Sequence, residues 1–280
     1  MKLITANKIE QTVASLCRQA NTRLPEDLRA AIVQAGRQER TPAGRAVMQD
    51  LAENARIASE LEVPICQDTG MVVVFVEIGQ DVTVTGDWIE TAIQRGVARG
   101  YREGYLRYSV VSDPLQRQNT GDNTPAVIHY SIVQGDQLRL VVAPKGFGSE
   151  NMSAARMLSP SDGEEGIRRF VLETVQAAGP NPCPPVVIGL GLGGTLEKAA
   201  LLAKQALLIP VGQTSPLPHL ARLEEELLKA VNSLGIGPGG LGGQTTALAL
   251  HILSYPTHIA GLPVVINMSC HATRHAEAVL

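Results

Sequence analysis

Three of the four cysteines in this chain lie far apart in the sequence, and each is next to an irregular stretch. Cys66 lies in Pro-Ile-Cys-Gln-Asp-Thr-Gly, Cys183 in Asn-Pro-Cys-Pro-Pro, and Cys270 in Asn-Met-Ser-Cys-His. Zinc sites usually show paired ligands such as C-x2-C, and none of these cysteines has a close cysteine neighbour. Three single thiolates that folding brings together can hold an iron–sulfur cluster through three irons and leave a fourth iron open to substrate.

A structural role is the alternative for any of these thiols, because free cysteine is among the most buried residue types. Cys17 fits that alternative. It lies beside an apolar stripe at helical spacing, formed by Ile9, Val13, Leu16 and Ala20. We therefore expect Cys17 to be a core residue.

Composition narrows the class of protein. The chain has 280 residues, of which 44% are hydrophobic and 18% charged, as in globular domains with a well-buried core. Aromatic residues make up 3% and the net charge is -3, so nucleic acid is not expected as the main partner. The sequence shows neither a membrane-spanning apolar run nor the apolar core of a signal peptide, which predicts a cytoplasmic protein with reduced thiols.

Local patterns predict the elements that must position these residues. Thr41-Pro42 opens a helix that proline stops at Val63-Pro64, so Cys66 is expected just beyond a helix end. Residues 72–78 are β-branched and apolar, which predicts a buried strand that residues 82–84 extend. Asp87 is the expected cap of a helix to residue 103. Residues 126–132 and 137–142 flank Gln134-Gly135-Asp136, which predicts a hairpin.

The second half shows the same mixture. Ser161-Asp162-Gly163-Glu164 is a capping-box pattern that opens a helix to about residue 178. Further patterns predict a strand at 185–189, helices at 195–208 and 217–233, and a last strand at 264–267. The expected fold is mixed α/β, with a largely helical N-terminal third followed by strands and helices packed as one compact domain over residues 1–280.

A rival function comes from glycine-rich segments. Gly189-Leu190-Gly191-Leu192-Gly193-Gly194 follows a strand-like run and precedes a helix-like one, as in the fingerprint of dinucleotide-binding oxidoreductases. The acidic residue expected about twenty positions later is missing. A second match at 235–240 follows a helix instead of a strand. Both segments are better explained as places where the backbone approaches a cluster, a ligand or another chain closely.

Two polar loops stay ambiguous by themselves. Residues 113–125 are rich in turn-forming residues and are compatible with an ordinary solvated loop. Residues 144–151, Pro-Lys-Gly-Phe-Gly-Ser-Glu-Asn, include Gly146 and Gly148, whose backbone N–H groups can face an anion.

In their residues and in their order along the chain, these segments resemble the alpha subunit of the two-subunit class I fumarases. These are oxygen-sensitive iron–sulfur hydro-lyases related to tartrate dehydratase. The resemblance covers nearly the whole chain and rests on Cys-Gln-Asp-Thr-Gly at 66–70, Asn-Thr-Gly-Asp-Asn-Thr-Pro-Ala at 119–126, Lys-Gly-Phe-Gly-Ser-Glu-Asn-Met at 145–152, Cys-Pro-Pro at 183–185, Gly-Ile-Gly-Pro-Gly-Gly-Leu-Gly-Gly at 235–243 and Ser-Cys at 269–270. It implies that Cys66, Cys183 and Cys270 ligate a [4Fe-4S] cluster, and it gives no role to Cys17.

The resemblance also implies a dicarboxylate substrate, and a bidentate arginine fork suits a carboxylate. Arg107 is the expected fork; a surface role is its alternative, and Arg102 and Arg117 are its neighbours. Gln67 is expected to bind the substrate at the edge of the cluster. Gly146 and Gly148 are also expected to bind the substrate.

Acid–base chemistry is expected from Asp68, whose carboxylate can exchange a proton with an iron-bound hydroxyl or orient an imidazole. His258 precedes Cys270 by the separation of the family's active-site histidine and is the expected imidazole, with a structural role as its alternative. His271 and His275 receive no assignment.

Single-chain members of the family carry a second, beta-type domain with further arginines, a lysine and a Lys-Gly-x-Thr-type motif, and this chain has no such motif. The resemblance therefore implies half an active site, completed by a separate beta-type subunit in an assembly such as α2β2. The expected reaction is the reversible hydration of fumarate to malate, a step of the tricarboxylic acid cycle. Tartrate dehydration is the alternative, and Phe147 is an apolar group that favours fumarate.

Overall fold

The computed structural model describes residues 2–280, which form a mixture of helices and strands. The chain divides into two compact units. Unit 1 contains the residues up to Pro25, Ala55–Phe147 and Arg274–Leu280, and unit 2 contains Glu26–Asn54 and Gly148–Thr273. The helix α3 (Pro42–Leu61) and the short helix α5 (Phe147–Glu150) cross the boundaries between the units.

Unit 1 is built on a four-stranded sheet in the order β10 (Ala276–Val279), β5 (Leu138–Lys145), β2 (Met71–Gly79) and β4 (Val127–Val133). The strands β2 and β4 are parallel, and the other neighbours are antiparallel. A separate two-stranded parallel sheet joins β1 (Lys2–Thr5) to β3 (Val82–Thr85).

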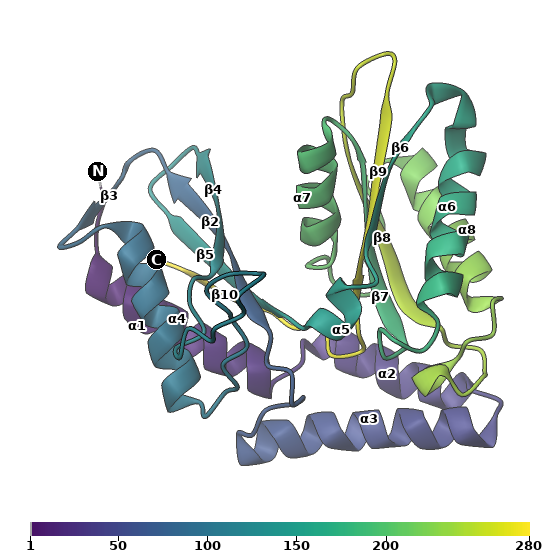
Figure 1. Ribbon diagram of the computed structural model, residues 1–280, viewed down its shortest axis with the longest axis horizontal. Coiled ribbons are helices and arrows are strands. Elements are labelled where there is room, and N and C mark those ends of the chain that lie inside the picture. The colour runs from purple at the N-terminus through teal and green to yellow at the C-terminus, as the bar shows by residue number, and fades with distance from the viewer. Residues whose placement is uncertain (1) are drawn as a thin grey trace. The chain divides into compact units, whose positions relative to one another are not determined.

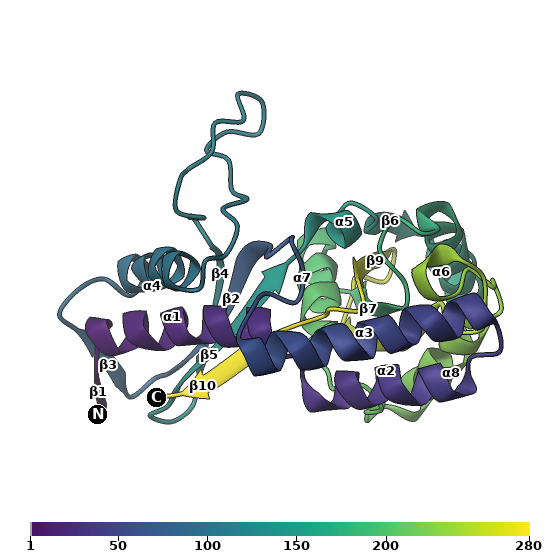
Figure 2. The same cartoon turned by 90° about the horizontal axis from the view of Figure 1, so that it is seen from below.

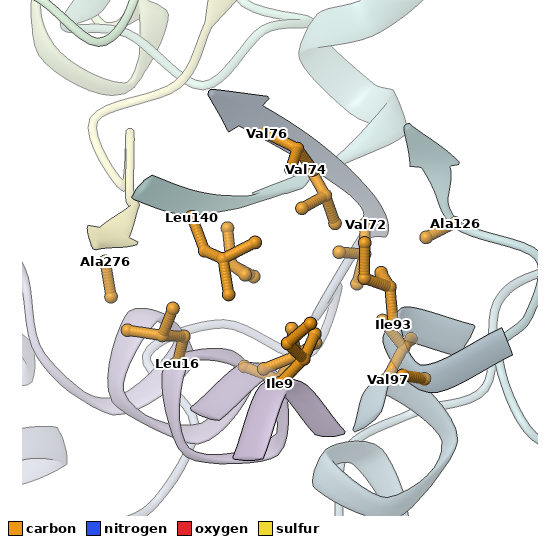
Figure 3. Close-up of a cluster of buried hydrophobic side chains, with 14 of the residues drawn as sticks. Ile9, Leu16, Val72, Val74, Val76, Ile93, Val97, Ala126, Leu140 and Ala276 are labelled. Carbon is orange, nitrogen blue, oxygen red and sulfur yellow. The ribbon is translucent and has the colours of Figure 1, made fainter. Parts of the chain in front are cut away.

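The helices α1 (Ala6–Thr22) and α4 (Ile89–Glu103) lie side by side in unit 1 and supply its core (Figure 2). Apolar side chains from both helices meet alternate residues of β2 and β5, among them Ile9, Leu16, Val72, Val74, Ile93 and Leu140 (Figure 3). Cys17 is fully buried in this cluster. The prediction that Cys17 is a core residue is thus confirmed.

Unit 2 is built on a second four-stranded sheet in the order β6 (Ala154–Leu158), β9 (Leu262–Ser269), β7 (Val186–Gly193) and β8 (Ala247–Tyr255). The strands β7 and β8 are parallel, and the other neighbours are antiparallel. The helices α6 (Gly163–Ala178) and α8 (Pro218–Asn232) cover one face, and α7 (Leu196–Ala206) covers the other (Figure 1). The helix α2 (Glu26–Gln38) and the 3-10 turns η1 (Pro160–Asp162) and η2 (Pro238–Gly240) complete the unit.

The glycine-rich run at 189–194 has a packing role. Gly189 and Gly191 are buried in β7, where a Cβ on either would overlap the carbonyl oxygens of Ala203 and Ala199 on α7. The glycines therefore allow the helix backbone to lie directly against the strand. The sequence predicted a cluster, a ligand or another chain as the close neighbour, and this is corrected: at Gly189 and Gly191 the neighbour is α7 of the same unit.

Several local predictions are corrected by pairing between distant strands. The hairpin expected at 126–142 is absent from the described chain, because β2 lies between β4 and β5. Residues 82–84 extend the small sheet with β1 instead of the main one. The helix after Asp87 has Trp88 at its N-cap, and the capping box lies at Ser159 and Asp162, two residues earlier than expected.

The mixed α/β fold and the largely helical N-terminal third are confirmed. The strands β1, β6, β8 and β10 were not predicted. The single-domain boundary of 1–280 stays a prediction, since each unit has its own sheet and core. Among residues 2–280, no helix combines the length and apolar character that crossing a membrane requires.

Candidate active site

Four loops meet at one end of the sheet in unit 1. The strands β2 and β4 begin at this end because they are parallel and in register at Val73 and Val127. The strand β5 ends here, since Lys145 pairs with Met71, and β10 begins beside it. This end of the sheet therefore brings Arg274 together with the segments 66–70, 119–126 and 145–147, which carry the family resemblance.

Asp68 is held between two of these loops. One carboxylate oxygen accepts the Gly70 N–H at 3.0 Å, and the other accepts the Phe147 N–H at 2.9 Å. A Cβ at Gly146 would lie 3.1 Å from the Asp68 carboxylate, so the glycine keeps this side of the carboxylate open. Two backbone donors in fixed positions orient Asp68 while each oxygen keeps a lone pair for another partner.

Three buried side chains hold the backbone that follows Cys66. Arg274 donates to the Asp68 carbonyl oxygen. Tyr101 donates to the carbonyl oxygens of Thr69 and Gly70, at 2.6 and 3.0 Å, and Asn123 donates to that of Gly70 at 3.1 Å. Burial and this carbonyl-donor role keep the Tyr101 phenol protonated, with a pKa raised far above its usual range chiefly by desolvation. The sequence predicted no role for these three positioning residues, although Asn123 lies in the segment 119–126 that carries the resemblance.

Arg107 and Gln67 are exposed near the same loops. The Arg107 carbonyl accepts the Thr69 hydroxyl at 3.0 Å, so its backbone is tied to the loop that carries Asp68. The Gln67 Oε1 atom lies 3.4 Å from the Cys66 Sγ atom. The Cys66 sulfur also accepts the Asp68 N–H at 3.4 Å. The structure thus brings together Cys66, Gln67, Asp68 and Gly146 within unit 1, and ties the backbone of Arg107 to their loop.

A matching arrangement occurs at one end of the sheet in unit 2. Cys183 precedes β7 and Cys270 follows β9, and these strands pair with Val187 opposite Ser269. The His271 Nδ1 atom lies 3.1 Å from the Cys183 carbonyl oxygen, so the two cysteine loops are in contact. Within unit 2 the structure therefore brings Cys183 and Cys270 to the same edge.

The backbone at Cys183 is unusual. Its φ of 56° lies in the left-handed region, which costs a residue with a Cβ about 1 kcal/mol. The side chain is exposed. Strain at an exposed cysteine is typical of a functional position.

The glycine-rich segment 235–243 packs against the Cys183 loop. The Gly239 N–H donates to the Pro184 carbonyl at 2.8 Å, and a Cβ at Gly240 would overlap Pro180. Buried Glu39 fixes the far end of the segment by accepting the N–H groups of Gln244 and Thr245. Burial alone would raise the pKa of Glu39, but these bonds and those from Arg40 and Thr41 lower it below its usual value.

A polar network lies just before Cys270. Asn267 donates to the Glu150 carboxylate and to the Ser153 hydroxyl, both at 2.8 Å, and Lys204 pairs with Glu150 at 2.5 Å. Glu150, from the segment 145–152 that carries the resemblance, thus helps to hold β9 in place. Gly148, in contrast, faces open space, with only the Asn181 carbonyl 3.8 Å from a built Cβ.

His258 lies at the opposite end of the same sheet. It is exposed in the loop between β8 and β9, beyond the pairing of Gly193 with Tyr255, whereas Cys270 follows the other end of β9. Its Nδ1 atom accepts the Ala260 N–H at 3.2 Å. Within unit 2 the structure does not bring His258 to Cys183 or Cys270, and its catalytic role stays a prediction.

The four thiols differ in access. Cys17 is fully buried, and burial raises its pKa to about 12 despite the opposing charge of Arg18. Cys66 and Cys270 are partly exposed, Cys183 is exposed, and none of the four forms a disulfide. Residues 2–280 contain no group of three His, Cys, Asp or Glu side chains close enough to hold one metal ion. Accessible thiols in loops can act as metal ligands, whereas the buried Cys17 thiol cannot.

A cavity of about 520 Å³ in unit 1 lies elsewhere. It is lined by residues at α1, after the end of α3 and at the end of α4, among them Arg18, Arg23, Glu62 and Glu103. None of the predicted site residues lines it.

Comparison with known proteins gives a consistent result. A family model described as "Fumarate hydratase (Fumerase)" matches residues 10–279. A protein of Methanocaldococcus jannaschii with the provisional name L(+)-tartrate dehydratase subunit alpha is 44% identical over 275 residues, which is 96% of either chain. L(+)-tartrate dehydratase subunit alpha of Escherichia coli is 32% identical over 271 residues, 96% of this chain and 89% of that protein.

Proposed function

This chain belongs to the fumarate hydratase (Fumerase) family of hydro-lyases, and we propose that it is the alpha-type subunit of an iron–sulfur enzyme that reversibly hydrates fumarate to malate. One observation carries the proposal most directly: an oriented carboxylate, Asp68, lies two residues from the accessible thiol of Cys66. The family match gives this pair its chemical meaning.

The proposed cluster ligands are Cys66, Cys183 and Cys270. Their access to solvent and their loop positions fit a cluster, and the buried thiol of Cys17 does not. When bound, a [4Fe-4S] cluster with one open iron supplies a Lewis acid for a substrate carboxylate and hydroxyl.

The residues of this chain would orient and protonate the substrate. The Asp68 carboxylate, fixed by the Gly70 and Phe147 N–H groups, is positioned to hold or deliver a proton at the substrate hydroxyl. Gln67 would donate from its amide beside Cys66, and Arg107 would bind a carboxylate through its fork. Gly146 and Gly148 leave the space that a small dicarboxylate needs.

A beta-type subunit would supply the remaining acid–base group and further cations. The relatives named above are called alpha subunits, which supports a partner chain. We expect negligible hydratase activity from this chain alone and a gain on adding a beta-type chain.

Anaerobic reconstitution with iron and sulfide tests the cluster. We expect the broad visible absorption of a [4Fe-4S] centre, lost when Cys66, Cys183 or Cys270 is replaced by Ala and kept in the matched variant Cys17→Ala. A colourless protein that binds zinc would contradict the proposal. NAD binding without sensitivity to oxygen would favour the oxidoreductase alternative.

Tartrate dehydration is the second candidate, because the two relatives named above are called tartrate dehydratase subunits. The half-exposed Phe147 ring offers an apolar contact where a second substrate hydroxyl would need a polar partner. Steady-state rates of the reconstituted enzyme distinguish the two substrates. A higher kcat/KM for tartrate than for malate would overturn the fumarate assignment.

A further inference from the structure

The edge strand β4 in unit 1 lacks the usual protection of sheet edges. Within residues 2–280 it has one neighbouring strand, β2, and it contains neither proline nor a charged Asp, Glu, Lys or Arg. Its apolar side chains are exposed: Val127 by 39%, Tyr130 by 44%, Ile132 by 81% and Val133 by 40%. Native proteins rarely leave a seven-residue apolar edge uncovered, because its free backbone groups pair readily with another strand.

The hydrogen bonds define which backbone groups face the open edge. The Val133 carbonyl accepts the Gln80 N–H at 2.9 Å, and Gln80 directly follows β2. Backbone groups alternate in direction along a strand, so those of Val133, Ser131, His129 and Val127 point towards β2. The N–H and C=O groups of Ile128, Tyr130 and Ile132 therefore point outwards, with Tyr130 in the middle.

The sequence of β4 is nearly the same in both directions. Around Tyr130 it has Ser131 and His129, then Ile132 and Ile128, then Val133 and Val127. If two such strands pair antiparallel about a two-fold axis at Tyr130, each Ile128 faces Ile132 of the other copy and each Val127 faces Val133. Matched β-branched pairs are favourable cross-strand neighbours. The same arrangement makes Tyr130 a hydrogen-bonded pair, as the outward direction of its backbone requires.

We propose that β4 pairs with β4 of a second copy of this chain, in antiparallel register about Tyr130, to form one continuous eight-stranded sheet. The occupant is a second copy because the strand is complementary to itself in both backbone direction and side-chain order. The contact is isologous, so it closes at a dimer instead of continuing into a fibre. This interface is independent of the catalytic proposal, since it uses no residue of the candidate site.

Mass measurement of the full chain tests the association. Sedimentation velocity at micromolar concentration should give about twice the monomer mass of 29.8 kDa. Ile132→Lys should shift the chain to monomer, because it places two like charges in the interface. Leu115→Lys is the matched control. Leu115 is 89% exposed and lies in a loop of unit 1 outside β4, so this variant should stay dimeric. A monomeric parent chain, or a dimer that survives Ile132→Lys, would overturn the proposal.

Disulfide formation tests the register. A hydrogen-bonded antiparallel pair has Cα atoms about 5.5 Å apart, within the range for a disulfide, so Tyr130→Cys should link to itself under mild oxidation. Ser131→Cys should not, because the two copies would be diagonal neighbours about 8 Å apart. Mass spectrometry of the joined peptide excludes links through the native cysteines. Disulfide linking of both variants to the same extent, or of neither, would contradict the two-fold register. If the chain is monomeric alone and its edge strand pairs only with a beta-type chain, the proposal is overturned and the edge belongs to that partner.

Discussion

Replacing Asn123 by Ala removes the side chain that ties two site loops together in unit 1. Asn123 is fully buried, accepts the Ser109 N–H at 2.6 Å and donates to the Gly70 carbonyl at 3.1 Å. Its φ of 64° lies in the left-handed region, which asparagine tolerates better than alanine. The substitution therefore leaves the Ser109 N–H without its acceptor and strains the backbone, whereas the Gly70 carbonyl keeps the Tyr101 hydroxyl as a donor.

The magnitude follows from these two effects. The donor left without a partner costs about 1–3 kcal/mol, and the left-handed backbone adds about 1 kcal/mol for alanine. We expect unit 1 to lose about 2–4 kcal/mol of unfolding free energy. Asn119→Ala is the matched control in the same loop. Asn119 also makes two hydrogen bonds, to the Tyr108 carbonyl and from the Gly121 N–H, but it is exposed and water can replace them, so its loss should stay below about 1 kcal/mol.

Native-state hydrogen exchange measures this loss locally, which matters because a chain of two units need not unfold in one step. The Ser109 amide should lose most of its protection in Asn123→Ala and little in Asn119→Ala. Urea unfolding gives the accompanying change in global stability. Equal effects of the two substitutions, or a loss below 1 kcal/mol in Asn123→Ala, would refute the reasoning from burial.

Three further predictions follow from buried groups. Cys17, whose pKa is raised to about 12 by burial, should resist thiol reagents at about pH 8 until the chain is denatured, and reaction of all four thiols in the folded chain would contradict this. Burial lowers the pKa of His251 below 6.5, so just below pH 6.5 the unfolded chain binds more protons than the folded chain. The free energy of unfolding should therefore fall as the pH drops from 6.5 through the lowered pKa. The urea midpoints of His251→Leu should depend less on pH than those of the parent chain. Arg274→Lys should lower kcat/KM of the reconstituted enzyme about tenfold while the cluster absorption stays, because a flexible ammonium does not hold the Asp68 carbonyl where the planar guanidinium holds it. Unchanged kinetics would exclude a positioning role.

Local sequence patterns were sufficient for elements whose signals are local. The run at 72–78 forms β2, and the Thr41-Pro42 signal begins α3 at Pro42. The false hairpin had an equally good local signal in Gln134-Gly135-Asp136. It failed because β2 is buried along most of its length and takes a neighbour on each side, and these neighbours are β4 and β5. Competition between strands distant in sequence has no local signature.

In the candidate site, too, some residues could be predicted from the sequence and others could not. Cysteines beside irregular segments, and Asp68 next to one of them, could be chosen from residue type and context. Tyr101 and Arg274 could not, since Tyr101 fits the apolar face of α4 and Arg274 has no periodic context. Their contribution is to hold carbonyl oxygens of the loop at 68–70. The packing of α4 in the core of unit 1 brings Tyr101 there, and the pairing of β10 with β5 brings Arg274 there.

His258 shows why separation along the chain is a poor guide to distance. Twelve positions separate it from Cys270, and eight of the intervening residues form β9. An extended strand rises about 3.3 Å per residue, so β9 alone separates the two by roughly 25 Å. The same twelve positions in a helix would cover about 18 Å, and in a turn far less. A histidine at one end of β9 cannot touch a cluster bound by Cys270 of its own unit at the other end. Any contact of His258 with such a cluster would therefore have to be made in another chain.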